Sequence, residues 1–272
     1  MKIAFLGLGS MNGSILHGLQ QANLPNTTFV ATCHSEASAA RAAETYQITV
    51  EASGVNPDAN LAAIESADVV LIGVKPAQVT GLLSEIAEDL EPKTIVVSVA
   101  AAVTVAQMEA VLKPGQPVVR TMPNTPTQVG AGVIGLCAGT NTNAEQLKSV
   151  QELLDQAAQT VVVDEAQMDA LTGVSGSGPA YVFHFAETLI KAGVEAGLDE
   201  QTAQELAIGT IAGAAKMLQQ DNADPENLRV AVTSPNGTTE AALRQLAPMG
   251  ELVEKAVLAA RDRAAEISAE LD

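Results

Sequence analysis

The chain has 272 residues, of which 32 are acidic and 14 basic, so its formal net charge is -18. This negative charge argues against nucleic acid or an anionic membrane as a partner. The two cysteines, Cys33 and Cys137, have neither disulfide-framework nor metal-site spacing, and we expect reduced thiols. No stretch is long and apolar enough to span a bilayer. We therefore expect a soluble, cytoplasmic protein.

The first 19 residues predict a strand, a tight turn and a helix. An apolar run is interrupted at Gly7 and Gly9, and apolar residues then recur at helical spacing. In a dinucleotide site Gly7 permits the turn and Gly9 lets a pyrophosphate approach the first N–H groups of the helix. Asn12 replaces the usual third glycine, so we expect Gly13 to ease packing of the helix on the strand. Such glycine turns also occur where no phosphate binds, but the N-terminal position favours a dinucleotide site.

Strand and helix signals alternate through the first part of the chain. Strands are expected at residues 3–8, 28–32, 69–74, 94–99, 118–120, 133–137 and 161–163, and helices at 14–22, 35–45, 76–86, 105–111 and 144–157. This alternation predicts an α/β fold with a doubly wound, mostly parallel, Rossmann-like sheet. From residue 168 onward only helices are indicated, with breaks at 196–199, 221–225 and 234–237. We expect a dinucleotide-binding domain at residues 1–163 and an all-α domain at residues 164–272.

The helical segment at residues 207–215 consists almost entirely of small or apolar residues. Such a helix has no face suited to water, so both its sides are expected to be covered. A larger bundle could cover it within one chain. Because the helical region has only about a hundred residues, we favour a second subunit and hence a homo-oligomer.

The end of the second strand bears on the choice between NAD and NADP. NAD sites usually place Asp or Glu there to accept from the ribose 2′-hydroxyl, whereas this chain has His34 and Ser35. His34, Ser35 and Arg41 could donate to a 2′-phosphate, and Asn60 could lie nearby. Glu36 keeps NAD open, and a solvent-facing loop position is an equal alternative for His34.

Further cofactor contacts are expected after later strands. Lys75 follows an apolar strand and precedes Pro76, which suits the first turn of a helix, so Lys75 could lie beside the phosphates or the nicotinamide. The small residues at 99–101 would allow a flat ring or ribose to pass closely. A rigid loop at residues 120–126 could fix the nicotinamide amide through its polar groups, and the contacts expected there are Met122, Pro123 and Asn124.

Two loops rich in glycine and hydroxyl groups precede helices in the second part. In the first, at residues 173–181, Ser177 or Gly178 can cap a helix and Pro179 suits its first turn. In the second, at residues 232–240, a Pro-Asn-Gly turn precedes a helix start at Thr238 or Thr239. Free N–H groups at such a start bind a carboxylate without an arginine. Each loop could be an ordinary capped helix start, but together they favour a substrate cradle.

Other chemistry has few candidate residues. His17, His34 and His184 have no metal-ligand spacing, and no Ser-His-Asp arrangement is evident. Hydroxyl dehydrogenases normally need a Lys or His proton relay, for which the helical part offers few candidates, such as Lys191 and Lys216. A substrate that is already polarised, such as a protonated imine, would need only orientation, a hydride donor and one hydroxyl.

Five motifs then occur in the order found in one enzyme family. They are GLGSM at residues 7–11, VKP at 74–76, RTMPNTP at 120–126, GSGPAY at 176–181 and TSPNGTT at 233–239. Over its whole length the chain resembles pyrroline-5-carboxylate reductase. The resemblance implies reduction of 1-pyrroline-5-carboxylate to L-proline by NADPH, or by NADH. It also implies a helical domain that interlocks with its twin in a dimer, with dimers often forming a decamer.

The resemblance also implies roles for single residues. Thr239 would hydrogen-bond the ring nitrogen, N–H groups around Gly237 and Thr238 would hold the substrate carboxylate, and Glu165 would lie near the substrate. Asn236 replaces a glycine of the family turn, a change that Asn tolerates because it adopts positive φ angles more readily than most residues. The implied cofactor contacts are Leu6, Gly7, Leu8, Gly9, Ser10, Met11, His34, Asn60, Gly73, Val74, Lys75, Pro76, Val99, Ala100 and Ala101.

Two other functions remain as alternatives. One is a different imine or 2-oxoacid reductase with the same pair of domains, from which the paired GSGPAY and TSPNGTT motifs distinguish the chain. The other is a regulatory module that binds the nucleotide without turnover, against which the substrate cradle argues.

Overall fold

The structure is a computed structural model that describes residues 1–271. Within these residues, eight strands form one sheet in the order β3-β2-β1-β4-β5-β6-β7-β8, and only β6 and β7 are antiparallel. The strand order changes direction between β1 and β4, so the carboxyl ends of these two strands open the crevice in which such folds bind ligands. The strands are β1 (Lys2–Leu6), β2 (Thr28–Cys33), β3 (Thr49–Ala52), β4 (Val69–Ile72), β5 (Ile95–Ser98), β6 (Val118–Pro123), β7 (Val133–Ala138) and β8 (Gln159–Val162).

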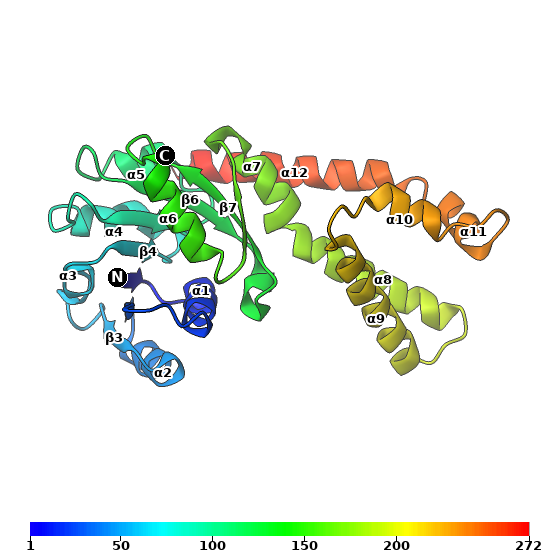
Figure 1. Ribbon diagram of the computed structural model, residues 1–272, viewed down its shortest axis with the longest axis horizontal. Coiled ribbons are helices and arrows are strands. Elements are labelled where there is room, and N and C mark those ends of the chain that lie inside the picture. Colours follow the sequence, from blue (N-terminus) through cyan, green and yellow to red (C-terminus); the bar gives the residue numbers. More distant parts are fainter. Residues whose placement is uncertain (272) are drawn as a thin grey trace. The chain divides into compact units, whose positions relative to one another are not determined.

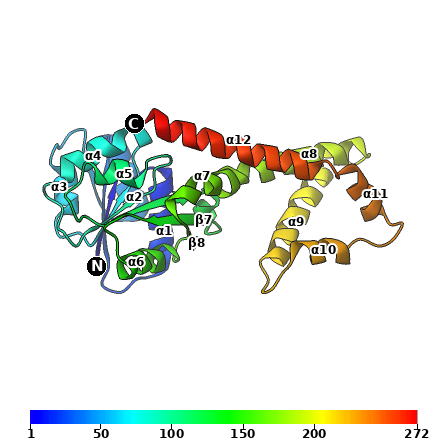
Figure 2. The ribbon, with the colours of Figure 1, turned by 90° about the horizontal axis from the view of Figure 1, so that it is seen from above.

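Helices cover both faces of the sheet (Figures 1 and 2). Because successive side chains of a strand point to opposite faces, Ile3 and Phe5 of β1 belong to one hydrophobic core, and Ala4 and Leu6 belong to the other. The first core packs against α1 (Ser10–Gln21) and α6 (Ala144–Leu154), with α2 (Glu36–Tyr46) beside β2 and β3. The second packs against α3 (Ala59–Ile64), α4 (Val79–Ile86) and α5 (Val105–Glu109). Short 3₁₀ turns η1 (Pro76–Gln78) and η2 (Thr125–Val129) follow β4 and β6.

The predicted α/β class with a doubly wound, mostly parallel sheet is confirmed, but two elements, β3 and α3, were not expected from the sequence. β3 is a partly exposed edge strand of four residues and α3 has six residues, so neither produces a sustained periodic pattern. The first strand is also shorter than predicted and ends at Leu6, because Gly7 adopts φ +78 and leaves the extended conformation.

The expected role of Gly13 in packing α1 on a strand is wrong. A Cβ at this position would overlap the hydroxyl group of Tyr46, the last residue of α2. Gly13 therefore makes room for the Tyr46 side chain, and the contact that it permits joins two helices.

The chain divides into two compact units. The first contains Met1–Ser177 and the stretch from Ala259 onward, and it holds the sheet; the second is Gly178–Leu258 and is helical. The three predicted helix breaks are confirmed, and a further break between α11 and α12, at residues 246–248, was not predicted. From residue 165 onward, across both units, the helices are η3 (Glu165–Gln167), α7 (Met168–Leu171), the π-helical turn η4 (Thr172–Gly176), α8 (Gly178–Glu195), α9 (Glu200–Leu218), α10 (Pro225–Ala231), α11 (Thr238–Gln245) and α12 (Met249–Glu270).

The boundary between these two compact units, after Ser177, lies later in the chain than the domain boundary predicted near Asp164. The predicted boundary separates the cofactor-binding part from the substrate-binding part and stays a prediction. The last helix, α12, begins in the second unit and ends in the first, where Leu271 packs against the second core of the sheet. None of the helices among residues 1–271 combines the length and apolar content needed to cross a bilayer.

Candidate cofactor and substrate sites

The turn after β1 has the geometry of an anion site. Gly7 has φ +78, and a Cβ there would lie 2.6 Å from Cγ1 of Val74, so both conformation and space favour glycine. Gly9 is extended, is the N-cap residue of α1 and has open space where a Cβ would lie. No side chain among residues 1–271 caps this helix. The N–H groups of its first turn are therefore available to an anionic group such as a diphosphate.

Asn12, at the place of the usual third glycine, braces this turn through hydrogen bonds. Its side chain is 1% exposed, and Nδ2 donates to the carbonyl oxygens of Gly7 (3.2 Å) and Leu71 (3.4 Å). A Cβ at Gly73 would overlap the Asn12 amide, so Gly73 supplies the space that this side chain needs. The brace ties the turn after β1 to β4.

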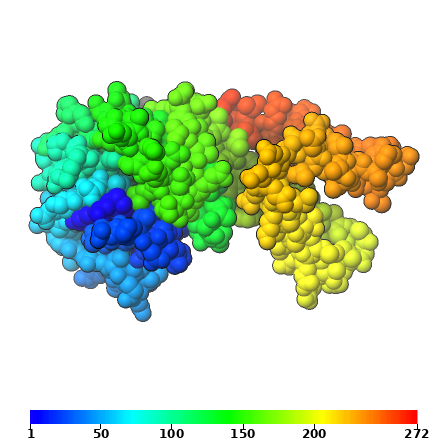
Figure 3. All heavy atoms as spheres, viewed as in Figure 1, coloured from blue at the N-terminus to red at the C-terminus, as the bar shows by residue number. Residues whose placement is uncertain are grey.

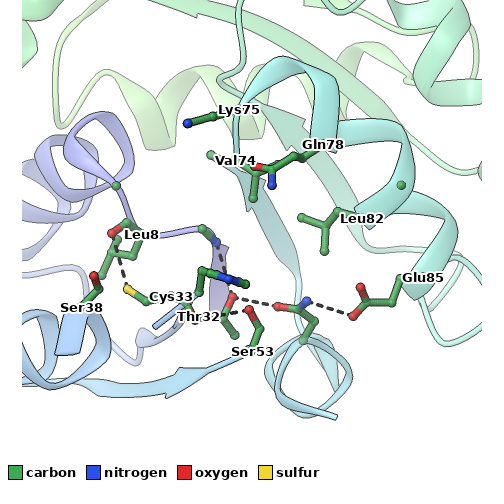
Figure 4. Close-up of a pocket in the computed structure, with 16 residues that line it drawn as sticks. Leu8, Thr32, Cys33, Ser38, Ser53, Val74, Lys75, Gln78, Leu82 and Glu85 are labelled. Atoms are coloured by element: carbon green, nitrogen blue, oxygen red, sulfur yellow. Dashed lines mark hydrogen bonds between the residues drawn. The ribbon is translucent and has the colours of Figure 1, made fainter. Parts of the chain in front are cut away.

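A cavity of about 590 Å³ lies at the carboxyl ends of β1, β2 and β4 (Figure 4). This volume is in the range of small-molecule sites, about 300–1,000 Å³. Eight of the expected cofactor residues line it: Gly7, Leu8, Gly9, His34, Asn60, Gly73, Val74 and Lys75. Among the described residues that line it, Lys75 is the only Lys or Arg, and its position suits a phosphate-bearing ligand.

Eight further lining residues were not among the predicted contacts. Ser53 follows β3, a strand of four residues that was not expected from the sequence. Four others lie at helical spacing in η1 and α4, after the VKP motif, but they differ in polarity and so form no periodic pattern that could have indicated the cavity. The eight residues are Thr32, Cys33, Ser38, Ser53, Gln78, Gly81, Leu82 and Glu85.

Hydrogen-bond donors gather where β2 meets α2. Ser35 is the N-cap of α2, and Ser38 Oγ accepts from both Ser35 Oγ (3.0 Å) and Arg41 Nη2 (3.2 Å). Ser38 lines the cavity, whereas Ser35 and Arg41 do not line it and reach it only through their hydrogen bonds to Ser38. Glu36 does not line the cavity. This corner presents hydroxyl and guanidinium groups where NAD sites usually present a carboxylate.

The other predicted cofactor contacts lie outside the cavity. Leu6, Val99 and Ala100 are buried in the two cores of the sheet, so their side chains are not available to a ligand. The remaining ones are exposed or occupy element ends: Ser10 and Met11 begin α1, Pro76 begins η1, Ala101 follows β5, Met122 and Pro123 end β6, and Asn124 follows it.

Asn124 and Met122 contact the π-helical turn at Thr172–Gly176. The Asn124 Nδ2 donates to the Ser175 carbonyl oxygen (3.2 Å) and to Ser175 Oγ (3.3 Å), and its Oδ1 accepts from the Val133 N–H (2.8 Å). A Cβ at Gly176 would lie 2.6 Å from Cε of Met122. The amide of Asn124 is therefore engaged in positioning this turn, and the expected contact with a nicotinamide amide stays a prediction.

Ser177 does not cap a helix, contrary to the sequence interpretation. Its N–H donates to the carbonyl oxygen of Thr172 (2.9 Å), which closes the π-helical turn, and its backbone is helical. The helical backbone runs on from α7 into α8, so no new helix start exists here to be capped.

The carboxylate of Glu165 is engaged within the sheet unit. Its Oε1 accepts from the Val105 N–H (2.7 Å) and from Nη1 of Arg120 (3.1 Å), a residue that is 5% exposed. Burial, together with the negative charge of Glu165, raises the pKa of Cys137 to about 11. Glu165 therefore joins β6 to the start of α5, and a substrate contact would depend on its other oxygen.

The second unit contains the turn expected to hold the substrate carboxylate. Asn236 adopts φ +59, which confirms that Asn replaces glycine here in a left-handed conformation. Its N–H donates to Oε2 of Glu240 (2.6 Å). Arg244, and then this N–H, lower the pKa of Glu240, so the carboxylate stays charged and holds the turn.

The first residues of α11 present free donors. Gly237 is the N-cap residue without a side-chain cap, and the N–H groups of Thr238 and Thr239 have no acceptor among residues 1–271. The Gly237 N–H, in contrast, donates to the Ser234 carbonyl oxygen (3.0 Å). Of the N–H groups expected to hold a carboxylate, the one of Gly237 is therefore engaged within the turn, whereas those of Thr238 and Thr239 are free.

Both halves of the chain match known protein families. Residues 2–102 match a family model described as NADP oxidoreductase coenzyme F420-dependent, and residues 165–267 match one described as pyrroline-5-carboxylate reductase dimerisation. Pyrroline-5-carboxylate reductase of Pseudomonas aeruginosa is 39% identical over 273 residues, with 99% of this chain and 98% of that protein covered. The chain belongs to the pyrroline-5-carboxylate reductase family.

Solved structures of family members have the same fold. The enzyme of Coxiella burnetii superposes with a TM-score of 0.90 at 32% identity and 97% coverage of both chains. The pyrroline carboxylate reductase of Plasmodium falciparum, solved with NADP bound, gives 0.83 at 27% identity and 98% coverage of both. The chain is accordingly a nicotinamide-dependent oxidoreductase that reduces 1-pyrroline-5-carboxylate to L-proline, the last step of proline biosynthesis.

Proposed function

We propose that NADPH is the cofactor and that it binds in the cavity at the carboxyl ends of β1, β2 and β4. The observation that carries this choice is the corner at the end of β2, where His34 and Ser38 line the cavity and Arg41 donates to Ser38. These groups can donate to a 2′-phosphate, whereas a carboxylate there would repel it. NADH is the alternative cofactor.

The sheet unit fits the rest of this cofactor. The open space at Gly9 and the uncapped start of α1 suit a diphosphate, and Lys75 adds a positive charge on the side of β4. When bound, the nicotinamide supplies the hydride. The chain's own residues hold the dinucleotide and keep the turn at Gly7 fixed through the Asn12 brace.

The start of α11 is proposed to orient the substrate. The hydroxyl of Thr239 hydrogen-bonds the ring nitrogen, and the N–H groups of Thr238 and Thr239 hold the carboxylate, supported by the partial positive charge of a helix start. A protonated C=N bond is already electrophilic, so orientation replaces the proton relay of hydroxyl dehydrogenases. Glu165 and Ser177 stay as further proposed substrate contacts.

Assembly into a dimer is part of the proposal, with residues 1–163 as the dinucleotide-binding domain and 164–272 as the substrate and dimerisation domain. Within residues 207–215 of α9 only Ala207 is buried in a single chain, and Phe183 of α8 and Leu252 of α12 are 66% and 64% exposed. Side chains of this unit are visible at the surface in yellow and orange in Figure 3. A second copy would cover such apolar surface; a decamer is the larger assembly that the resemblance implies.

The experiment is a spectrophotometric assay of NADPH oxidation after addition of 1-pyrroline-5-carboxylate, with the product identified by chromatography. We expect stoichiometric L-proline and a lower KM for NADPH than for NADH. NADPH binding without oxidation would favour a nucleotide-sensing module instead. A lower KM for NADH would overturn the assignment of the β2 corner to a 2′-phosphate.

A further inference from the structure

A chain of hydrogen bonds crosses the floor of the cofactor cavity (Figure 4). The Gly7 N–H donates to Oγ1 of Thr32 (3.4 Å), and this hydroxyl donates to Oδ1 of Asn60 (2.8 Å). Nδ2 of Asn60 donates in turn to Oε1 of Glu85 (2.9 Å). All four residues line the cavity, and they come from the turn after β1, from β2, from α3 and from α4.

Glu85 determines the direction of every bond in this chain. An ionised carboxylate only accepts hydrogen bonds, so the amide nitrogen of Asn60 must face Glu85 and its oxygen must face Thr32. The Thr32 hydroxyl then has to donate to Asn60, which leaves its lone pairs for the Gly7 N–H. Without an acceptor at residue 85 the Asn60 amide can turn over, and the Thr32 hydroxyl loses its fixed orientation.

Thr32 and Asn60, the two middle residues of this series of hydrogen bonds, are buried, so the direction of their hydrogen bonds matters for stability. Thr32 is 2% and Asn60 is 6% exposed, so water cannot readily replace a lost partner. Glu85 lies on the exposed side of α4, where its carboxylate stays hydrated while it accepts from Asn60. The exposed Glu85 carboxylate therefore fixes the orientation of the buried Asn60 amide and Thr32 hydroxyl.

We propose that Glu85 is a positioning residue for the dinucleotide, acting through Asn60 and Thr32 on the turn at Gly7. The inference rests on the proposed cofactor site. It assigns to Glu85 a hydrogen-bonding role and no contact with the reacting atoms, so cofactor affinity depends on residue 85 while the rate at saturation does not.

The test measures the Kd of NADPH by fluorescence titration, together with KM and kcat, in variants of the full-length protein. Glu85→Ala is expected to raise Kd and KM about fivefold to tenfold with kcat unchanged, which is the effect of losing one hydrogen bond. Glu85→Gln keeps an oxygen that accepts from Asn60 and is expected to stay within about twofold of the unmodified protein. Glu88→Ala is the matched control, because Glu88 has the same charge, lies nearby and does not line the cavity.

A double-mutant cycle tests whether Glu85 affects NADPH binding through its hydrogen bond to Asn60 and the hydrogen bond of Asn60 to Thr32. Thr32→Val removes the middle hydroxyl and Thr32→Ser retains it. Because Thr32 and Glu85 are linked only through Asn60 in these bonds, Thr32→Val with Glu85→Ala is expected to weaken binding no more than the weaker-binding single variant. The proposal would be overturned if the losses of NADPH affinity in the two single variants added in the double variant. It would also be overturned if Glu85→Ala and Glu85→Gln lost equal affinity, or if Glu85→Ala bound NADPH as tightly as the unmodified protein. A protein that binds NADPH but reduces no imine would fail the proposed function and leave this binding test intact.

Discussion

The side-chain amide of Asn124 donates to the backbone carbonyl oxygen of Ser175, the residue four positions before Pro179. In a regular α-helix that carbonyl would accept from the N–H of residue 179, which proline lacks. Asn124 thus supplies the donor that the helical run from α7 to α8 is missing. The RTMPNTP and GSGPAY motifs are linked by this bond, and Asn124 is best understood as part of the framework around the site.

Asn124→Ala should destabilise the protein by about 1–3 kcal/mol, because it leaves the Ser175 carbonyl and the Val133 N–H without partners. In a Pro179→Ala background the cost should be smaller, since residue 179 then has an N–H for the same carbonyl. Urea unfolding of the four proteins in this cycle measures the difference. An equal cost in both backgrounds would show that Asn124 does not compensate for Pro179.

Asn12 gives a second stability prediction. Asn12→Asp replaces the amide donor with a second acceptor beside the Gly7 and Leu71 carbonyl oxygens, at a position that is 1% exposed. We expect a lower thermal midpoint than for Asn12→Ala, because burying an unpaired charge costs more than losing a hydrogen bond. Calorimetry of both variants without cofactor makes the comparison. If Asn12→Asp were the more stable of the two, the amide would not be the brace described here.

The stability of the protein should fall above pH 9, in part because of Cys137. Burial and Glu165 raise the pKa of this thiol from its ordinary value of 9.0 to about 11 in the folded protein. The unfolded chain then loses the proton first, so the contribution is constant below pH 9 and decreases as the pH rises toward 11. Urea unfolding at about pH 8 and about pH 10.5 measures the free energy of unfolding at each pH. Its decrease between the two should be smaller for Cys137→Ala than for the unmodified protein. Equal decreases would mean that the Cys137 thiol does not contribute.

Sequence patterns predicted the architecture well but the side-chain partners poorly. Apolar runs such as the one in β4 are evident from the local sequence, and Gly7 has a local conformational reason in its positive φ angle. The engagement of Asn124 depends on residues about fifty positions away, and no spacing rule connects them. The same is true of the Glu165 carboxylate in η3, whose partner Arg120 lies on β6, 45 positions earlier in the chain. Short elements such as β3 are too brief for periodicity, and Ser53 was missed with it.

Thr239→Ala should lower kcat by about tenfold to a hundredfold, the range of one well-placed polar group, and should leave the Kd of NADPH nearly unchanged. The reason is that the hydroxyl acts on the substrate and the cofactor cavity belongs to the other unit. Thr239→Ser is the matched control and should retain most of the turnover. Steady-state kinetics with fluorescence titration separates the two effects, and unchanged turnover in Thr239→Ala would remove this residue from the site.

The most direct test of the central claim is a crystal structure with NADPH and L-proline bound. The account predicts the dinucleotide in the cavity lined by Gly7, His34 and Lys75, and the ring nitrogen of proline within hydrogen-bonding distance of a Thr239 hydroxyl. Proline bound away from every Thr239 in the crystal, or NADPH bound outside this cavity, would contradict it.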